Sequence, residues 1–254
     1  MIPLRDNIPT LRFPAVTIVL LVTNVLAYFL WQRGGILHGP SDANVIDYGW
    51  IPYEIKHPGQ QCIAQGEGIA CGEVNGQPSV LVTAFTSMFM HGSILHLAGN
   101  MLFLWIFGNN VEDSMGKPKF IIFYLLGGLA ALAGQTLVAN GDGNAVPLVG
   151  ASGAIAAVLG GYIVLYPRAR VLTLIFIILF FTIIEIPAMV VLGIWFLQQL
   201  LFGAYGLSDP TGGGGGVAYF AHIGGFVFGL LLIRAFARRK NPNYPPRPAS
   251  SMVA

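Results

Sequence analysis

The chain has 254 residues, of which 55% are hydrophobic and only 9% are charged. Soluble domains carry about 25% charged residues, so the composition excludes an ordinary water-soluble protein and predicts a membrane protein. The formal net charge of +2 gives no reason to expect nucleic-acid binding. We therefore expect the lipid bilayer as a partner, and no nucleic acid.

The first twelve residues, 1–12, hold charges and prolines, and we expect a short cytoplasmic tail rather than a cleavable signal. A helix needs about 20 mostly apolar residues to cross the hydrocarbon core of a bilayer. Five later stretches meet this demand, although the second of them contains polar residues. They are residues 13–31, 94–111, 120–139, 148–166 and 217–233.

Residues 171–205 are harder to interpret because Glu185 and Pro187 interrupt them. They fit either one crossing with an interfacial lead-in or a tight hairpin of two crossings. With one crossing, eleven of the thirteen Lys and Arg residues lie on one side of the membrane. Only Arg33 and Lys56 lie on the other side. Short cytoplasmic loops collect such residues, so we expect an all-α protein with six crossings and both termini in the cytoplasm. Pro187 would then start the fifth helix.

This topology divides the chain into a membrane domain at 13–236 and a basic, proline-rich tail at 237–254. We expect the tail to be disordered in the cytoplasm. The membrane domain includes a long outer loop, 32–79, which contains Cys62 and Cys71. On an oxidising side of the membrane these two cysteines could form a disulfide, but two free thiols fit equally well.

Four polar residues fall at one predicted depth, within about 10 Å of the outer ends of three helices. They are His96, Asn100, Ser152 and His222. Each has a simpler reading, because small residues, glycine-flanked histidines and buried amides often serve helix packing alone. Their joint occurrence at one depth, on helices that glycines allow to approach closely, favours a chemical site.

This set of residues suits acyl transfer. A serine hydroxyl needs a base to remove its proton, and a neutral histidine serves near pH 7, so Ser152 and His222 are the candidate nucleophile and base. Candidate donors to the developing oxyanion are the Asn100 amide, the His96 ring and the Ser152 N–H. Glu185 lies too far away in depth to orient His222, so we expect a dyad without an acid.

Other routes to peptide cleavage lack their parts. The predicted membrane segments contain no Asp for two-aspartate chemistry, and neither His91 nor His96 is followed by the Glu of a zinc motif. A zinc ion held by His91, His96 and His222 is conceivable, but a spacing of five residues suits a shared helix face poorly. We expect no metal and no cofactor.

Three runs in the chain look like the signature segments of rhomboid proteases: HGSILHLAGNM at 91–101, GASG at 150–153 and AHIGG at 221–225. The resemblance implies an intramembrane serine endopeptidase that cuts membrane-anchored proteins near the outer face, and we expect it in the plasma membrane. It assigns the dyad to Ser152 and His222. It assigns the oxyanion hole to His96, Asn100 and the Ser152 amide. The supporting positions are His91 at the mouth of the site, Gly150 and Gly153.

One position departs from this family's pattern. Many rhomboids carry an aromatic residue four positions after the serine, stacked on the catalytic histidine, and here that position is Ala156. Another ring, or none, must orient His222. Two other classes of function stay open: a non-catalytic membrane binder, which a serine-directed fluorophosphonate would not label, and a small transporter, which uptake by proteoliposomes would reveal.

Overall fold

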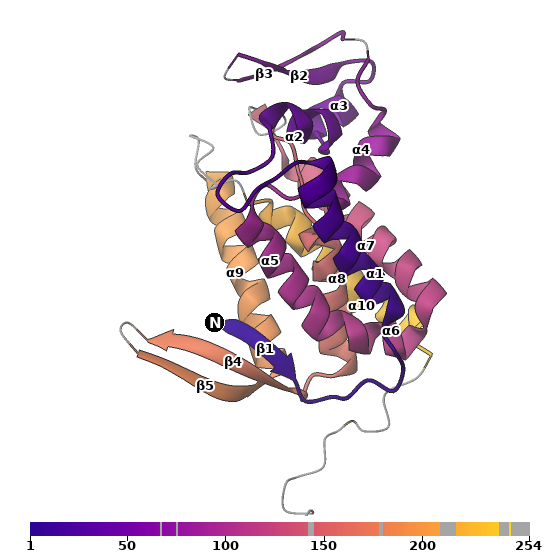
Figure 1. Cartoon of the computed structure of the whole chain (residues 1–254), viewed down its shortest axis with the longest axis vertical. Coiled ribbons are helices and arrows are strands. Elements are labelled where there is room, and N and C mark those ends of the chain that lie inside the picture. The colour runs from indigo at the N-terminus through magenta and orange to yellow at the C-terminus, as the bar shows by residue number, and fades with distance from the viewer. Residues whose placement is uncertain are drawn as a thin grey trace, which may run out of the picture.

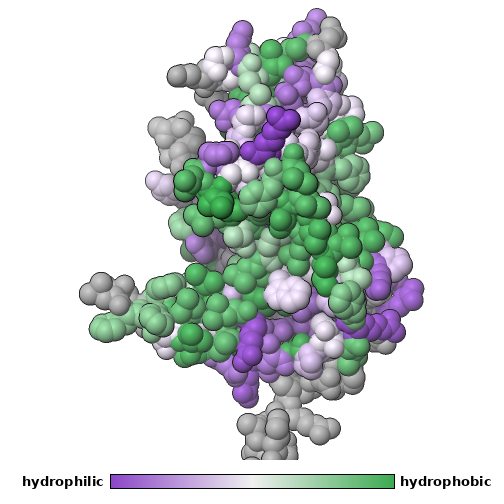
Figure 2. Space-filling view, viewed as in Figure 1, coloured by the Kyte–Doolittle hydropathy of each residue, from purple (hydrophilic) through white to green (hydrophobic). Residues whose placement is uncertain are grey.

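The computed structural model describes the chain except for residues 67, 75, 142–144, 178–179, 209–216, 239–243 and 245–254. Figure 1 shows a helical bundle with a small sheet at one end and a cap of short elements at the other. On the face that Figure 2 shows, the surface of the bundle between these ends is largely apolar. A mostly helical membrane protein was the expectation, and the structure agrees.

The bundle is built from apolar helices close to the predicted stretches. They are α1 (Ala15–Leu26) with its π-helical extension η1 (Ala27–Trp31), α5 (Ile94–Phe103) continued by η3 (Leu104–Gly108) and α6 (Asn109–Met115), α7 (Lys117–Val138), α8 (Ser152–Leu165), α9 (Ala188–Ser208) and α10 (Tyr219–Phe236). Among the described residues, four helices are long and apolar enough to cross a membrane, at 94–115, 117–138, 188–207 and 219–236. The α1 unit and α8 are shorter.

A three-stranded sheet corrects the all-α expectation. Its strands are β1 (Ile2–Asp6), β4 (Arg170–Ile177) and β5 (Phe180–Pro187), in the order β1-β4-β5 with antiparallel pairing. The run that begins with Val171 is rich in β-branched and aromatic residues, which suit a strand. Residues 171–205 therefore form a β-hairpin and one helix. The helix α9 begins one residue after Pro187, close to the predicted start.

The predicted outer loop folds into a cap above the bundle (Figure 1). It contains α2 (Asp42–Tyr48), α3 (Pro52–Lys56), β2 (Gln61–Gln65) and β3 (Gly68–Gly72), and α4 (Val80–Thr86) with η2 (Ser87–Phe89) leads from it into the bundle. Cys62 and Cys71 face each other across the β2–β3 pair and form a disulfide. The disulfide is the alternative that the sequence alone left open.

The start of the first bundle helix, α1, and the end of the last, α10, both lie at the end of the molecule that carries the sheet. Leu11 N–H donates to the Asp113 carboxylate over 2.9 Å, and Arg238 N–H donates to the Ser114 carbonyl over 2.9 Å. Lys119 reaches the Phe236 carbonyl at 3.1 Å. The start of α1 and the end of α10 are thus both anchored to the turn between α6 and α7.

One of the predicted membrane segments extends further as helix than its predicted bounds and contains two acids. The predicted segment 94–111 continues as helix to Met115 and takes in Glu112 and Asp113, both buried. Glu112 accepts hydrogen bonds from the Thr17 N–H and hydroxyl, each over 2.8 Å. Its carboxylate thus pairs with an N–H group that the first turn of α1 leaves without a partner in the helix. Glu185 itself lies on β5 and pairs with Arg170 at 3.2 Å.

Only three residues of the predicted tail at 237–254 fall within the described part of the chain: Ala237, Arg238 and Tyr244. The Tyr244 hydroxyl accepts a hydrogen bond from the Arg168 N–H over 2.9 Å, and its ring packs on Tyr166 with centroids 5.3 Å apart. The rest of the segment predicted to be disordered lies outside the described residues.

The helix α8 is the centre of the bundle. Eleven of its fourteen residues are buried, and it packs between α7 and α10. Its apolar residues run around the whole helix, which is typical of a helix surrounded by others. The N-terminus of this central helix carries the candidate nucleophile.

Candidate active site

The structure brings Ser152 and His222 into direct contact. Ser152 is the first residue of α8, and His222 lies in the first turn of α10. The Ser152 Oγ atom lies 2.8 Å from His222 Nε2, which is hydrogen-bond distance. Two residues 70 positions apart thus form the arrangement that a nucleophile and its base require.

Close packing of α8 against α10 sets this distance. Gly225 lies one turn after His222, and a Cβ atom there would overlap the carbonyl oxygen of Gly153. Gly229, one turn further, faces the Ala157 carbonyl in the same way. On the opposite side, Gly153 lies against the Ala131 side chain of α7. The glycines therefore let the backbones approach until a serine and a histidine can touch.

The other ring nitrogen of His222 has a partner that the sequence analysis missed. His222 Nδ1 lies 2.8 Å from Oε1 of Gln199, which is on α9 and is buried with 6% exposure. The Gln199 Nε2 donates to the Trp195 backbone carbonyl over 3.2 Å. A glutamine inside an apolar helix was the available signal. The adjacent Gln198 is exposed, so the sequence could not distinguish the two.

An aromatic ring does lie beside His222, although Ala156 supplies none. The Trp195 ring from α9 has its centroid 5.7 Å from that of His222, tilted by 39°. Ala156 is fully buried, and a Cβ atom added at Gly225 would lie 3.3 Å from the Ala156 side chain. A large ring at position 156 has no room against α10, and the indole from α9 contacts the histidine instead.

Three candidate donors lie on α5 and at the start of α8. Ile155 N–H makes the first intrahelical bond of α8, to the Ala151 carbonyl, so the Ser152 N–H has no partner within the helix. Gly150 has a φ of +136°, and a Cβ atom there would lie 2.8 Å from the His96 ring. His96 thus lies beside the loop that precedes Ser152. The Asn100 Nδ2 is buried without a hydrogen-bond partner in the described structure.

His91, which the resemblance assigned to the mouth of the site, is buried next to His96. Its side chain is fully buried and packs edge-on against His96, with centroids 5.1 Å apart. Its backbone is held by Gln32, which accepts from the His91 N–H at 2.9 Å and donates to the His91 carbonyl at 3.2 Å. The Gln32 side chain thus holds the His91 backbone in place, with the His91 ring against that of His96.

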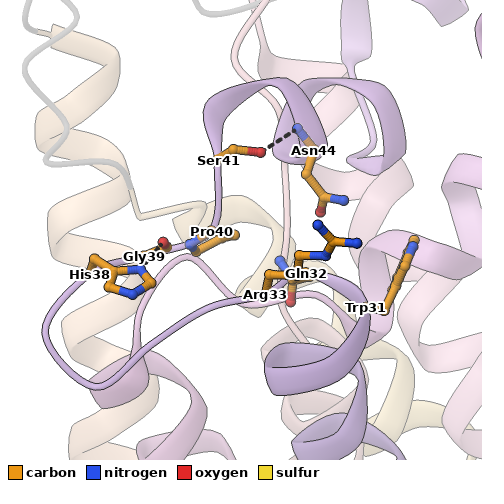
Figure 3. Close-up of a pocket in the computed structure, with 8 residues that line it drawn as sticks. All are labelled: Trp31, Gln32, Arg33, His38, Gly39, Pro40, Ser41 and Asn44. Atoms are coloured by element: carbon orange, nitrogen blue, oxygen red, sulfur yellow. Dashed lines mark hydrogen bonds between the residues drawn. The ribbon is translucent and has the colours of Figure 1, made fainter.

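An open hollow of about 680 Å³ lies beside Gln32, between η1 and the start of α2. Figure 3 shows it lined by Trp31, Arg33 and Asn44 together with the loop that holds His38. Neither Ser152 nor His222 lines it. This hollow belongs to the cap rather than to the candidate site. In the described part of the chain, no group of three His, Cys, Asp or Glu side chains is arranged to hold a metal ion.

The comparisons with known proteins identify the family of the chain. The family model described as "Rhomboid domain" matches residues 78–239, which include α5, α8 and α10 and therefore every residue of the candidate site. The chain belongs to the rhomboid family. The resemblance that the three sequence runs indicated is thus confirmed.

Three curated relatives show how far this rhomboid has diverged. It is 30% identical over 161 residues to Rhomboid protein 1, mitochondrial, of Saccharomyces cerevisiae, 30% over 148 residues to Presenilin-associated rhomboid-like protein A, mitochondrial, of Danio rerio, and 31% over 159 residues to RHOMBOID-like protein 12, mitochondrial, of Arabidopsis thaliana. The matches cover 57–59% of this chain but only 35–43% of the relatives.

The expected location in the plasma membrane is contradicted by these relatives, all of which carry mitochondrial names. The charge asymmetry between loops could not have corrected the expectation, because it reports the side of a membrane and not which membrane it is. Hydropathy and charge contain no further signal that would have identified the compartment.

Proposed function

We propose that this rhomboid is an intramembrane serine endopeptidase that cleaves membrane-anchored proteins within or near their transmembrane segments. The observation that carries the proposal is the 2.8 Å contact between Ser152 Oγ and His222 Nε2 inside an apolar bundle. Neither residue needs a metal or cofactor for the reaction. The names of the relatives favour a mitochondrial membrane as the location.

In the proposed reaction, His222 Nε2 takes the hydroxyl proton as Ser152 Oγ attacks the carbonyl carbon of the scissile bond. The negative charge that develops on the carbonyl oxygen is met by the Ser152 N–H, the Asn100 amide and the His96 ring. The carbon–nitrogen bond then breaks as His222 returns the proton to the leaving amine. A water molecule, activated by the same histidine, hydrolyses the acyl-enzyme.

The unpartnered Asn100 Nδ2 supports this assignment. A buried amide donor without an acceptor costs about 1–3 kcal/mol, so a protein that keeps one needs a reason. An oxyanion that exists only during the reaction supplies it. The Ser152 N–H at the start of α8 is a second donor that the helix leaves unpaired.

We also propose that the chain crosses the membrane six times, with both termini in the compartment equivalent to the cytoplasm. The support is the number of apolar helices and the meeting of the α1 start with the α10 end at the α6–α7 turn. The shortness of α8 fits this reading because neighbouring helices bury it, and its ends need not reach both surfaces.

The test is cleavage of a single-pass reporter protein by the purified full-length chain in detergent. We expect cleavage by the wild type, and none by Ser152→Ala or His222→Ala, because each variant lacks a reacting group but adds no bulk. A fluorophosphonate should label the wild type and leave Ser152→Ala unlabelled. Cleavage by Ser152→Ala at the wild-type rate would disprove the mechanism, and a folded wild type that neither cleaves nor labels would favour the binder.

A further inference from the structure

We propose that Gln199 is a positioning residue that holds the His222 ring in the tautomer with hydrogen on Nδ1, leaving Nε2 free to accept the Ser152 proton. The inference rests on the proposed protease function for its kinetic consequence. Its structural part does not, since it follows from three hydrogen bonds. No acid takes part in it, which separates it from triads in which a carboxylate orients the histidine.

The orientation of the Gln199 amide is the first step. An amide has one end that accepts and one that donates, and density or geometry alone seldom distinguishes them. Here the helix decides, because one end faces the Trp195 carbonyl at 3.2 Å. A carbonyl oxygen can only accept, so the NH2 group must point to it. The Gln199 Oε1 must then point to His222 Nδ1, 2.8 Å away.

The tautomer follows from that orientation. Since Gln199 Oε1 is only an acceptor, the hydrogen bond at 2.8 Å requires a hydrogen on His222 Nδ1. A neutral imidazole carries one N–H, so Nε2 is left with a lone pair. That nitrogen lies 2.8 Å from the Ser152 hydroxyl, which can then donate to it. The opposite tautomer would place a hydrogen between Nε2 and the hydroxyl and leave Oε1 facing a bare nitrogen.

Burial makes the arrangement selective. Gln199 is 6% exposed, so water cannot readily replace the lost donor if the opposite tautomer leaves Gln199 Oε1 without a partner. Trp195, one helical turn earlier on α9, has its ring beside His222 and limits rotation of the imidazole. One face of α9 therefore supplies both the hydrogen bond and the steric wall.

The experiment compares Gln199→Leu and Gln199→Glu with Gln198→Leu in the full-length protein. The neighbouring Gln198 is exposed, so Gln198→Leu makes the same chemical change on the same helix away from His222. We expect Gln199→Leu to lower kcat about 10- to 100-fold on the single-pass reporter, with KM and melting temperature within about twofold and 3 °C of wild type. Gln198→Leu should match the wild type. Gln199→Glu keeps an acceptor and should recover most of the lost rate.

A second readout does not depend on cleavage. In protein labelled with ¹⁵N-histidine, the His222 signals, assigned with His222→Ala, should show hydrogen on Nδ1 in the wild type and in Gln198→Leu. Gln199→Leu should shift the ring towards the Nε2–H form. A wild-type ring with hydrogen on Nε2, or an unchanged ring and unchanged kcat in Gln199→Leu, overturns the proposal. Wild-type protein with Nδ1–H but without Ser152-dependent cleavage would instead refute the protease function and leave the hydrogen-bond assignment standing.

Discussion

The helices α8 and α9 both contact His222, but their surroundings differ sharply. Most of α8 is buried, and backbone atoms of α10 lie where side chains would otherwise be. On α9 the side chains around Gln199 are largely exposed, for example Leu197 at 53% and Leu201 at 62%. The dyad is thus fixed by dense packing on one side and oriented on the other by a helix whose side chains are mostly exposed. Helix packing sets the distance between Ser152 and His222, and the hydrogen bond to Gln199 sets the tautomer of the imidazole.

The most severe test of this contrast exchanges two glycines for alanine, one on α10 where that helix packs against α8 and one on α9. Gly225→Ala should lower kcat/KM by about 10² or more, because the added methyl group overlaps the Gly153 carbonyl and forces α8 away from α10. It should also cost about 1–3 kcal/mol through overpacking. The measurements are reporter cleavage and melting temperature.

The matched control is Gly193→Ala on α9, where an added Cβ meets nothing within 4 Å. We expect activity within about twofold of wild type and equal or slightly higher stability, since alanine favours helix by up to about 1 kcal/mol. Equal losses in the two variants would contradict the idea that packing around α8 alone sets the dyad distance.

A second substitution tests whether the proposed reaction also depends on a side chain of α5. Asn100→Ala should lower kcat by about 10² to 10³ with a smaller change in KM, because one oxyanion donor is worth roughly 3 to 4 kcal/mol in the transition state. Asn24→Ala is the control, since Asn24 is also buried and its Nδ2 bonds to the Leu20 carbonyl at 2.7 Å.

The control should alter melting temperature and leave kcat near that of wild type. If Asn100 were only a packing residue, its removal would cost about 0.6 kcal/mol, the average for such interactions in membrane proteins. Near-normal kcat in a destabilised Asn100→Ala protein would therefore remove this residue from the oxyanion hole.

The smallest expected effect lies at the sheet end, far from the dyad. Burial raises the pKa of Asp6 to about 6 from 3.8, although Tyr162 and Asn110 donate to its carboxylate at 2.5 and 2.8 Å. The folded state therefore favours the protonated form. The stabilisation of the folded state by the protonated Asp6 carboxyl is complete below about pH 4 and is lost as the pH rises through about 6. The free energy of unfolding falls by at most about 3 kcal/mol over this range.

The variant Asp6→Asn stays neutral and should lack this dependence. We expect the melting temperature of the wild type, relative to that of Asp6→Asn, to fall by several degrees between pH 4.5 and pH 7.5. Reporter cleavage at pH 7.5 should be the same for both proteins. A pH-independent difference would mean that another group controls the acid dependence of this end.

The contact between Ser152 and His222 could be predicted because its signals in the sequence are local. Ser152 and His222 stand beside glycines at helical spacing, and their depth follows from counting along each helix. Gln199 and Trp195 were missed because α9 is apolar on all sides, so nothing in the sequence says which face meets α10. Their role depends on the rotation of one helix against another, which only tertiary packing fixes.

The hairpin of β4 and β5 was missed for a different reason. Short apolar runs fit a buried helix and a strand equally well, and the adjoining α9 extends the apolar stretch beyond the length of any strand. Pairing with β1, 165 or more positions earlier in the chain, selects the strand, and no local signal reports it. The Cys62–Cys71 bond likewise depends on the turn between β2 and β3.

The same hairpin fixes how deep the chemistry lies. Within the described sheet β5 pairs only with β4, and an open strand edge is not tolerated in the hydrocarbon core, so the core must begin near Ala188. Gln199, eleven residues further along α9, then lies about 17 Å into a core about 30 Å thick. In the proposed reaction, the scissile bond must descend about 13 Å from the opposite surface to reach this depth. A substrate helix of the proposed protease would have to unwind at a depth where bulk water does not replace its lost hydrogen bonds, so helices that unwind easily should be cut first.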